Sequence, residues 1–101
     1  MIIKLEILKE AEVDILEGFN FYELQQLGLG KYFIDSIFSD IDFIKISAGA
    51  HPIENEHHKI LSKKFPFAIY YTLSKSGQTV KVNAVIDCRR NPAWVRRKLK
   101  R

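Results

Sequence analysis

Residues 65–94 constrain the fold of this chain more than any other stretch, because they contain two apolar runs separated by a short break. Both runs are rich in β-branched and aromatic residues, which pack well on the pleated surface of a sheet. The break, Lys75-Ser76-Gly77, contains a glycine that allows the chain to reverse its direction. The stretch is therefore predicted to form a β-hairpin.

Both runs alternate with a period of two, which places every second side chain on one face of a strand. In the first run these side chains are Phe65, Phe67, Ile69, Tyr71 and Leu73, and in the second they are Val80, Val82, Ala84, Ile86 and Cys88. We expect both sets to face one core, with Cys88 as a small buried side chain.

The second run leads directly into Asp87-Cys88-Arg89-Arg90-Asn91-Pro92, which is followed by Ala93 and Trp94. Two adjacent arginines at the end of a strand are held in place by a rigid sheet. A guanidinium can grip a phosphate through two parallel hydrogen bonds. The end of the hairpin is therefore predicted to be an anion-binding site.

Charge is divided sharply between the two halves of the chain. Residues 1–56 contain 4 of the 16 Lys and Arg residues and 11 of the 12 Asp and Glu residues. Residues 57–101 contain the other 12 basic residues and a single acid, so the net charges are −7 and +11. A field polarised in this way attracts polyanions to one side of the molecule. A solvated basic face kept for solubility is the alternative explanation.

Upstream of the hairpin, the pattern predicts one strand and two helices. Residues 2–8 alternate as a strand, with Ile3, Leu5 and Ile7 on one face. Apolar residues at three- and four-residue steps predict a helix over about 9–27 and a second over about 30–48. The core stripes of the two helices are Ala11, Ile15, Phe19 and Tyr22, then Phe33, Ile37, Ile41, Ile44 and Ala48.

Residues 57–63 are predicted to form a further strand before the hairpin, after an irregular lead-in, and residues 92–101 a short helix. Asn91 followed by Pro92 is a typical helix start, since Asn caps free N–H groups and Pro suits the first helical position. The predicted order is β-α-α-β-β-β with a short C-terminal helix, in one domain spanning residues 1–101. The fold class is α+β, a small, mostly antiparallel sheet with an N-terminal helical hairpin on one face and the other face open.

The sequence also argues against several classes of protein. A single cysteine excludes an internal disulfide and fits a reducing compartment. The N-terminal MIIKLEILKE has no run long enough for a signal peptide or a membrane span, so we expect a cytoplasmic protein without a membrane partner. No Cys/His set has zinc-ligand spacing, and no P-loop or dinucleotide motif is present, so we expect neither a metal nor a cofactor.

Several strings in the sequence resemble the RelE/ParE toxins of bacterial type II toxin–antitoxin systems, in their plasmid-stabilisation branch. They are Phe65-Pro66-Phe67-Ala68-Ile69-Tyr70-Tyr71, the strand ending in Ala84-Val85-Ile86-Asp87-Cys88-Arg89-Arg90-Asn91-Pro92, and Trp94. The match also includes Gly28-Leu29-Gly30 before Phe33 and runs almost from end to end. Relatives often have histidine at the end of the last strand, where this chain has Asp87.

This resemblance implies a helical hairpin on a small sheet, a growth-inhibiting activity and a cognate antitoxin protein as partner. RelE-like members cleave mRNA on the ribosome without a metal, whereas ParE-like members bind and poison DNA gyrase. Ribosome-dependent mRNA cleavage, by a metal-independent endoribonuclease, is our first expectation, and gyrase inhibition without catalysis is the alternative. A basic nucleic-acid-binding module without toxicity is a third interpretation, which the charge of the second half alone supports.

Metal-free RNA cleavage needs a proton acceptor for a 2′-OH, charge stabilisation at phosphorus, and a proton donor for the leaving oxygen. Arg89 and Arg90 suit charge stabilisation, and His58 or its neighbour His57 suits acid–base work near neutrality. Asp87 is a candidate base, or a residue that orients Arg89. The candidate phosphate contacts are Lys59, Lys63, Lys64, Arg89 and Arg90.

Overall fold

A computed structural model of the protein describes residues 3–100, and the element order is β1-α1-α2-β2-β3-β4-β5-α3. The α+β prediction is confirmed. The elements are β1 (Lys4–Ile7), α1 (Lys9–Gln25), α2 (Leu29–Ser47), β2 (Ile53–Glu54), β3 (His57–Leu61), β4 (Phe67–Leu73), β5 (Thr79–Asp87) and α3 (Pro92–Leu99). Ile2 and Arg101, expected in the first strand and the last helix, lie outside the described residues.

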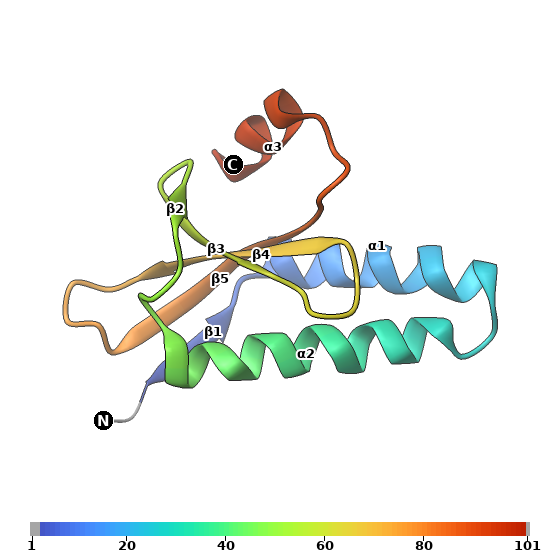
Figure 1. The fold of residues 1–101 in the computed structure, drawn as a ribbon, viewed down its shortest axis with the longest axis horizontal. Helices are drawn as coiled ribbons and strands as arrows, with labels where there is room; N and C mark the ends of the chain where they lie inside the picture. Colours follow the sequence, from blue (N-terminus) through green and yellow to red (C-terminus); the bar gives the residue numbers. More distant parts are fainter. Residues whose placement is uncertain (1–2, 101) are drawn as a thin grey trace.

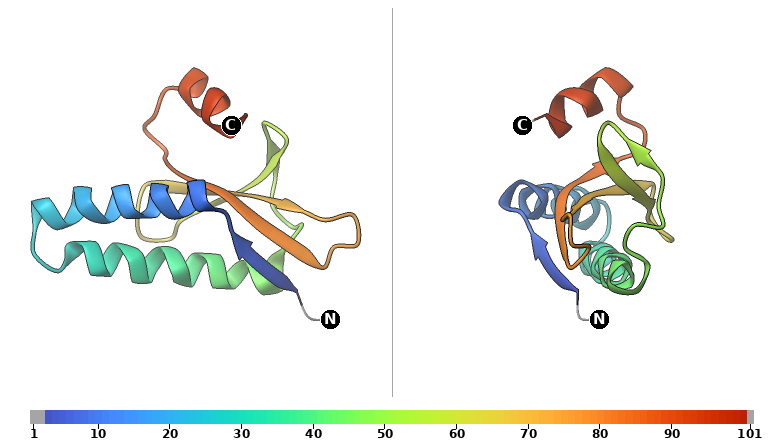
Figure 2. Two further views of the ribbon diagram at one scale, coloured as in Figure 1. Left: turned by 180° about the vertical axis from the view of Figure 1, so that it is seen from behind. Right: turned by 90° about the vertical axis from the view of Figure 1, so that its left-hand side faces the viewer.

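The five strands form one sheet in the order β1-β5-β4-β3-β2. Only β1 runs parallel to its neighbour, β5, and the other pairs are antiparallel. The helical hairpin of α1 and α2 covers one face of the sheet, and α3 lies over the other (Figures 1 and 2). The expectation of an open second face is therefore wrong, because Val95, Leu99 and Trp94 of α3 pack there against Ala68, Tyr70, Ala84 and Ile86.

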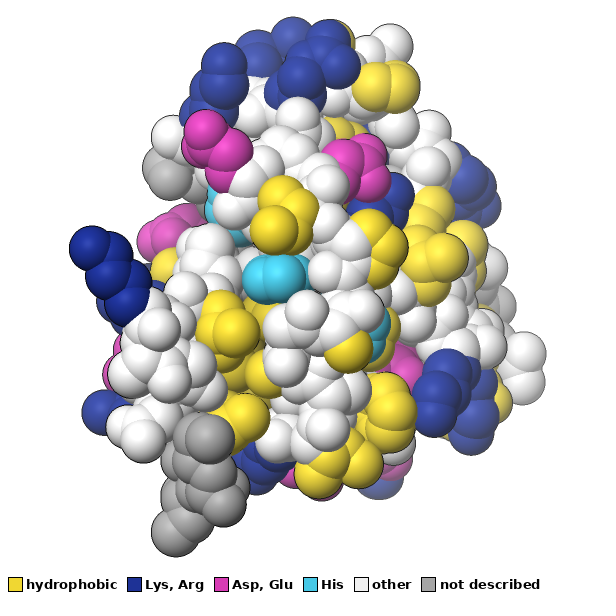
Figure 3. Space-filling model, turned by 60° about the vertical axis from the view of Figure 1, so that its left-hand side comes forward, with side chains coloured by type: hydrophobic (Ala, Val, Ile, Leu, Met, Phe, Trp, Pro, Cys, Tyr) yellow, Lys and Arg dark blue, Asp and Glu magenta, His cyan; other side chains and the backbone are white. Residues whose placement is uncertain are grey.

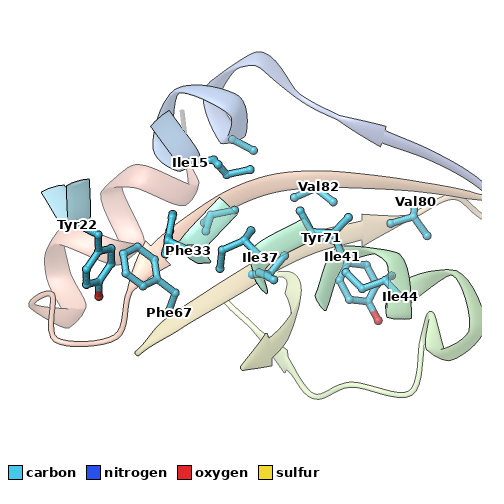
Figure 4. Packing of buried hydrophobic residues seen from close by; sticks show 13 residues of the cluster. Ile15, Tyr22, Phe33, Ile37, Ile41, Ile44, Phe67, Tyr71, Val80 and Val82 are labelled. Atoms are coloured by element: carbon cyan, nitrogen blue, oxygen red, sulfur yellow. The ribbon is translucent and has the colours of Figure 1, made fainter. Parts of the chain in front are cut away.

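The larger core lies between the sheet and the two long helices. The predicted stripes of both helices enter this core except at Phe19 (Figure 4). Ala48 packs against the core half-buried, whereas Phe19 is half-buried next to Gly30. The predicted face of β4 is confirmed, because Phe67, Ile69 and Tyr71 are buried in this core. Gly18 of α1 lies against the ring of Phe33 of α2, where a Cβ would come within 2.5 Å of Phe33 Cζ. The absence of a side chain at Gly18 thus lets the two helices approach closely.

The predicted face of β5 is half wrong, because a β-bulge changes its alternation. Tyr70 pairs with Ala84 but Tyr71 pairs with Val82, so Asn83 is an extra residue in β5. Before the bulge, Val80 and Val82 face the larger core, and after it Ala84 and Ile86 face α3. Cys88, at the end of this run, is exposed rather than buried.

Several element ends also differ from the sequence prediction. The first helix, predicted to reach about residue 27, ends at Gln25, and Gly28, which is left-handed with φ 90°, is the N-cap residue of α2. Glu23 of α1 accepts the N–H groups of Gly28 and Gly30 and so caps α2. The third strand ends at Leu61 instead of Lys63, and the lead-in contains the unexpected two-residue strand β2. Asn91 caps α3 as predicted, accepting the Ala93 N–H at 2.8 Å.

Candidate functional site: a cationic end of the sheet

Asp87 and Arg89 form a closed ion pair at the end of β5. Arg89 Nε lies 2.9 Å from Asp87 Oδ1, Arg89 Nη2 lies 2.6 Å from Oδ2, and the Arg89 backbone N–H also donates to Oδ1. These hydrogen bonds hold the pKa of Asp87 below its usual value. Asp87 is therefore ionised with both oxygens occupied, and it orients Arg89.

Arg90 points toward α3, where it meets an aromatic ring. Its Cζ lies 4.4 Å from the centroid of Trp94, and Lys98 Nζ lies 5.2 Å from the same ring. A guanidinium over an indole is a cation–π contact, which fixes its position while leaving its N–H groups available. Within residues 3–100, the Arg90 guanidinium forms no ion pair with a carboxylate. Arg90 is thus the cation of the predicted pair that remains available to an anion.

Two hollows meet at Arg90. The first, which we call the α1 groove, has a volume of about 490 Å³ and runs between α1 and α3 along the edge of β5. Its lining includes Asp14, Glu17, Gly18, Phe21, Phe67, Val85, Ile86, Asp87, Arg89, Arg90, Trp94 and Lys98. The second, the α3 groove, has a volume of about 210 Å³ and lies between β2–β3 and α3. Its lining includes Glu54, Asn55, Lys59, Ala68, Tyr70, Ile86, Asp87, Cys88, Arg90, Pro92, Val95 and Arg96.

Lys59 and Arg90, two of the predicted phosphate contacts, both line the α3 groove. The pairing of Lys59 with Tyr70 puts it on the α3 side of the sheet, with Nζ 5.9 Å from the Tyr70 ring centroid. Its ammonium donates to Glu54 Oε2 at 3.0 Å. This hydrogen bond raises the pKa of Lys59, so the side chain stays protonated near neutrality.

The other two predicted lysines lie outside both grooves. Lys63 and Lys64 follow the end of β3, in a loop that runs beside α2. Lys63 Nζ lies 4.8 Å from the Phe43 ring centroid, and Lys64 Nζ lies 5.2 Å from that of Tyr32. The structure therefore does not bring these lysines together with Arg89 and Arg90.

His58 is also separate from the arginines. His58 pairs with Tyr71 and faces the larger core. Asp87 pairs with Phe67, which lies four residues from Tyr71 along β4. The two positions are therefore about 13 Å apart along the strand. The His58 ring stacks on Tyr71 at a centroid distance of 5.0 Å, and its Nδ1 lies 2.8 Å from the His51 carbonyl oxygen. His51 Nδ1 lies 2.6 Å from the Tyr71 hydroxyl, which accepts the Gly49 N–H. His58 therefore belongs to a polar cluster at the end of α2.

A buried ion pair that the sequence analysis missed joins α1 to α3. Asp14 Oδ1 lies 2.6 Å from Lys98 Nζ, and their side chains are only 3% and 17% exposed. Asp14 Oδ2 also accepts the backbone N–H of Val85 at 3.0 Å, on the edge of β5 beyond the end of β1. The signal available in the sequence was an acid within the buried stripe of a helix, between Ala11 and Ile15.

The cationic surface is concentrated over α3. Arg96, Arg97 and Lys98 lie in its last turn, where positive charge also complements the helix dipole. Figure 3 shows Lys and Arg side chains gathered at the top of the molecule, with acidic side chains next to them. Within residues 3–100, no group of His, Cys, Asp and Glu side chains is arranged to hold a metal ion. No helix in that range is long and apolar enough to cross a membrane.

The backbone is similar to that of a chain in the structure of the chromosomal ParDE toxin–antitoxin system from P. aeruginosa, with a TM-score of 0.70 and 13% sequence identity. The similarity covers 85% of this chain and 96% of the other chain. No protein-family model matches this sequence, and no curated protein matches it either. The fold that the sequence resemblance predicted is thus the fold that the structure has.

Proposed function

We propose that this chain, as one domain, is the toxin component of a toxin–antitoxin pair and is neutralised by a cognate antitoxin. The observation that carries the proposal is the shared fold with a chain of the ParDE system over most of both chains. The cationic end of the sheet supports it, because Arg90 is held on Trp94 between two grooves. Ribosome, mRNA and gyrase all occur in the cytoplasm, so a toxin of either mechanism acts there.

Ribosome-dependent mRNA cleavage is the first candidate mechanism. The α3 groove is lined by three cations, Lys59, Arg90 and Arg96, and the half-buried ring of Trp94 lies beside Arg90. Positive charge follows a phosphate backbone and aromatic rings stack on bases, so this combination suits single-stranded RNA. In this mechanism Arg90 stabilises negative charge at phosphorus, with Lys59 as a second phosphate contact.

DNA gyrase inhibition without catalysis is the second candidate, and the state of the proton acceptors favours it. Both oxygens of Asp87 are bound by Arg89, and the pKa of Lys59 is raised rather than lowered. His58 lies on the opposite face of the sheet, in the cluster around Tyr71. A binding inhibitor needs the charges of the site but none of these groups as a base.

Controlled expression in bacteria tests the toxin proposal and separates the two mechanisms. We would label new protein and new DNA in the first minutes after induction of the wild type, Arg90→Ala and the matched control Lys75→Ala. Lys75 is an exposed lysine in the turn before β5, away from both grooves. Early loss of translation that only Arg90→Ala relieves supports mRNA cleavage, and early loss of DNA synthesis supports gyrase inhibition. Normal growth with folded wild-type protein would refute the toxin proposal and favour a non-toxic nucleic-acid-binding module.

The antitoxin partner can be tested independently of the mechanism. A toxin gene is expected beside a small open reading frame, whose product should bind this chain. If that product covers the arginines, replacing Arg89 and Arg90 with Glu weakens the complex because it reverses two charges. Unchanged affinity would place the antitoxin interface elsewhere.

A further inference from the structure

The β2–β3 hairpin places an acid inside a groove that is otherwise cationic. Glu54 of β2 reaches Lys59 of β3 across the hairpin, with Oε2 and Nζ 3.0 Å apart. Glu54 and Asn55 form one wall of the α3 groove, and Arg90 and Arg96 line the same hollow. The tip of the hairpin and α3 lie side by side in all three ribbon views (Figures 1 and 2).

Charge in the α3 groove makes Glu54 an unusual residue there. The second acid in the lining, Asp87, is already neutralised by its bidentate bond to Arg89. Glu54 is therefore the acid that offsets the charge of Lys59, Arg90 and Arg96. Its carboxylate accepts the hydrogen bond from Lys59 Nζ that an oxygen of a bound phosphate would otherwise accept.

The segment that carries Glu54 is weakly attached to the rest of the sheet. Strand β2 has two residues, both exposed, and it pairs with β3 alone at the end of the strand order. The turn that joins the two strands has two non-glycine residues in the left-handed region, Asn55 with φ 53° and Glu56 with φ 65°. Asn tolerates this conformation well, but Glu56 is strained in it, and opening the tip of the hairpin would relieve that strain.

We propose that the β2–β3 hairpin is an acidic flap in which Glu54 competes with the phosphodiester backbone of a nucleic acid for Lys59. When a strand enters the α3 groove, Lys59 exchanges the carboxylate for a phosphate oxygen, and the tip of the hairpin turns away. The resting protein then binds nucleic acid more weakly than its cations alone would allow. This inference rests on the proposed function in taking nucleic acid as the ligand of the groove.

The ion pair sets the size of the expected effect. The side chains of Glu54 and Lys59 are 51% and 29% exposed, so the pair has the strength of a surface ion pair. Such pairs are worth less than about 1 kcal/mol, which corresponds to at most about a fivefold change in affinity. Glu54→Gln, which removes the charge but keeps the shape, should tighten nucleic-acid binding about two- to fivefold.

Fluorescence anisotropy with a labelled RNA of about ten nucleotides, and with DNA of the same sequence, measures this effect. Salt should be kept near 50 mM because phosphate contacts weaken steeply at higher salt. Glu56→Gln is the matched control, since it removes the same charge from the same hairpin but outside the groove. Tighter binding by Glu54→Gln than by Glu56→Gln is the expected result. Equal affinities for the two variants, or no binding of either probe, would overturn the flap.

A double-mutant cycle tests whether Glu54 acts through Lys59. In a Lys59→Ala background, Glu54→Gln should no longer tighten binding, because the cation it competes for is gone. The same gain in both backgrounds would overturn the competition, and circular dichroism checks that each variant is folded. This binding assay uses purified protein and does not depend on toxicity in cells. If the wild-type protein were not toxic but Glu54→Gln still tightened binding, the proposed function would be refuted and the flap would stand.

Discussion

Replacing Asp14 with Ala should destabilise the protein strongly, because this carboxylate joins three elements in a buried site. The change removes the partner of the Lys98 ammonium, which is 17% exposed, and the acceptor of the Val85 N–H. Removing one member of a buried ion pair costs about 3–5 kcal/mol of stability. A buried N–H left without an acceptor costs about 1–3 kcal/mol. We therefore expect Asp14→Ala to lower the free energy of unfolding by about 3–5 kcal/mol.

Chemical and thermal unfolding followed by circular dichroism measures this loss. A domain of this size loses about 4–8 °C in Tm per kcal/mol, so the expected drop exceeds about 12 °C. Trp94, the single tryptophan of the chain, lies 5.2 Å from Lys98 Nζ and reports on α3 by its fluorescence. A changed emission in the folded variant would show that the ion pair also positions α3.

The exposed pair of Asp42 and Lys45 provides the control. Their charged atoms are 3.0 Å apart on α2, with side chains 70% and 53% exposed, so Asp42→Ala should cost less than about 1 kcal/mol. Lys98→Met added to Asp14→Ala should cost less than the sum of the single changes, because neither charge is then left alone. If Asp14→Ala were no more destabilising than Asp42→Ala, the reasoning from burial would be refuted.

Two further changes test the core and the histidine cluster. Gly18→Ala should destabilise the protein by about 1–3 kcal/mol in urea unfolding, because the new Cβ would lie 2.5 Å from Cζ of the fully buried Phe33. A cost no larger than that of a substitution at an exposed helix position would contradict this close packing. Burial, and to a smaller extent the neighbouring His58, lowers the pKa of His51, so the unfolded chain binds a proton more readily than the folded chain. The contribution of His51 to stability is therefore present above its unfolded pKa of about 6.5 and is lost as the pH falls through its lower folded pKa. His51→Gln should flatten this part of the pH profile, and an unchanged profile would assign the acid sensitivity to another group.

Helical and strand periodicity predicted the core well, because burial on one side leaves a regular record in the sequence. The alternation of β4 and the stripes of α1 and α2 were correct for this reason, except at Phe19. The face of β5 was wrong after Asn83, where the consecutive apolar residues Ala84, Val85 and Ile86 depart from strict alternation. Three buried neighbours in a row indicate a strand covered on both faces, which the expectation of an open face did not consider.

The sequence indicated charged residues at the end of β5 but not the ion pairs that they form. Arg90 and Lys59 do line one groove, and Arg89 lies at the end of the same strand. Their partners depend on tertiary details, since Glu54 reaches Lys59 only because β2 folds back on β3. The sequence did not show which face His58 occupies, because Ile60 and Leu61 put an apolar residue on each side of the strand. The role of Asp14 follows from its burial in α1, which a search for sequence motifs does not detect.

The parallel pairing of β1 with β5 has a consequence for the synthesis of this protein. Lys4 pairs with Thr79, 75 positions later in the chain (from 4 to 79), so β1 has no neighbouring strand until the ribosome has made β5. Pairing across such a separation is slow, because closing a long loop costs chain entropy before any stabilising contact has formed. The helical hairpin can form early, but Arg89 and Arg90 take their places only after β5 has paired with β1 and β4. A chain interrupted before residue 79 would present unpaired strand edges, which invite aggregation, and would have no anion site at all.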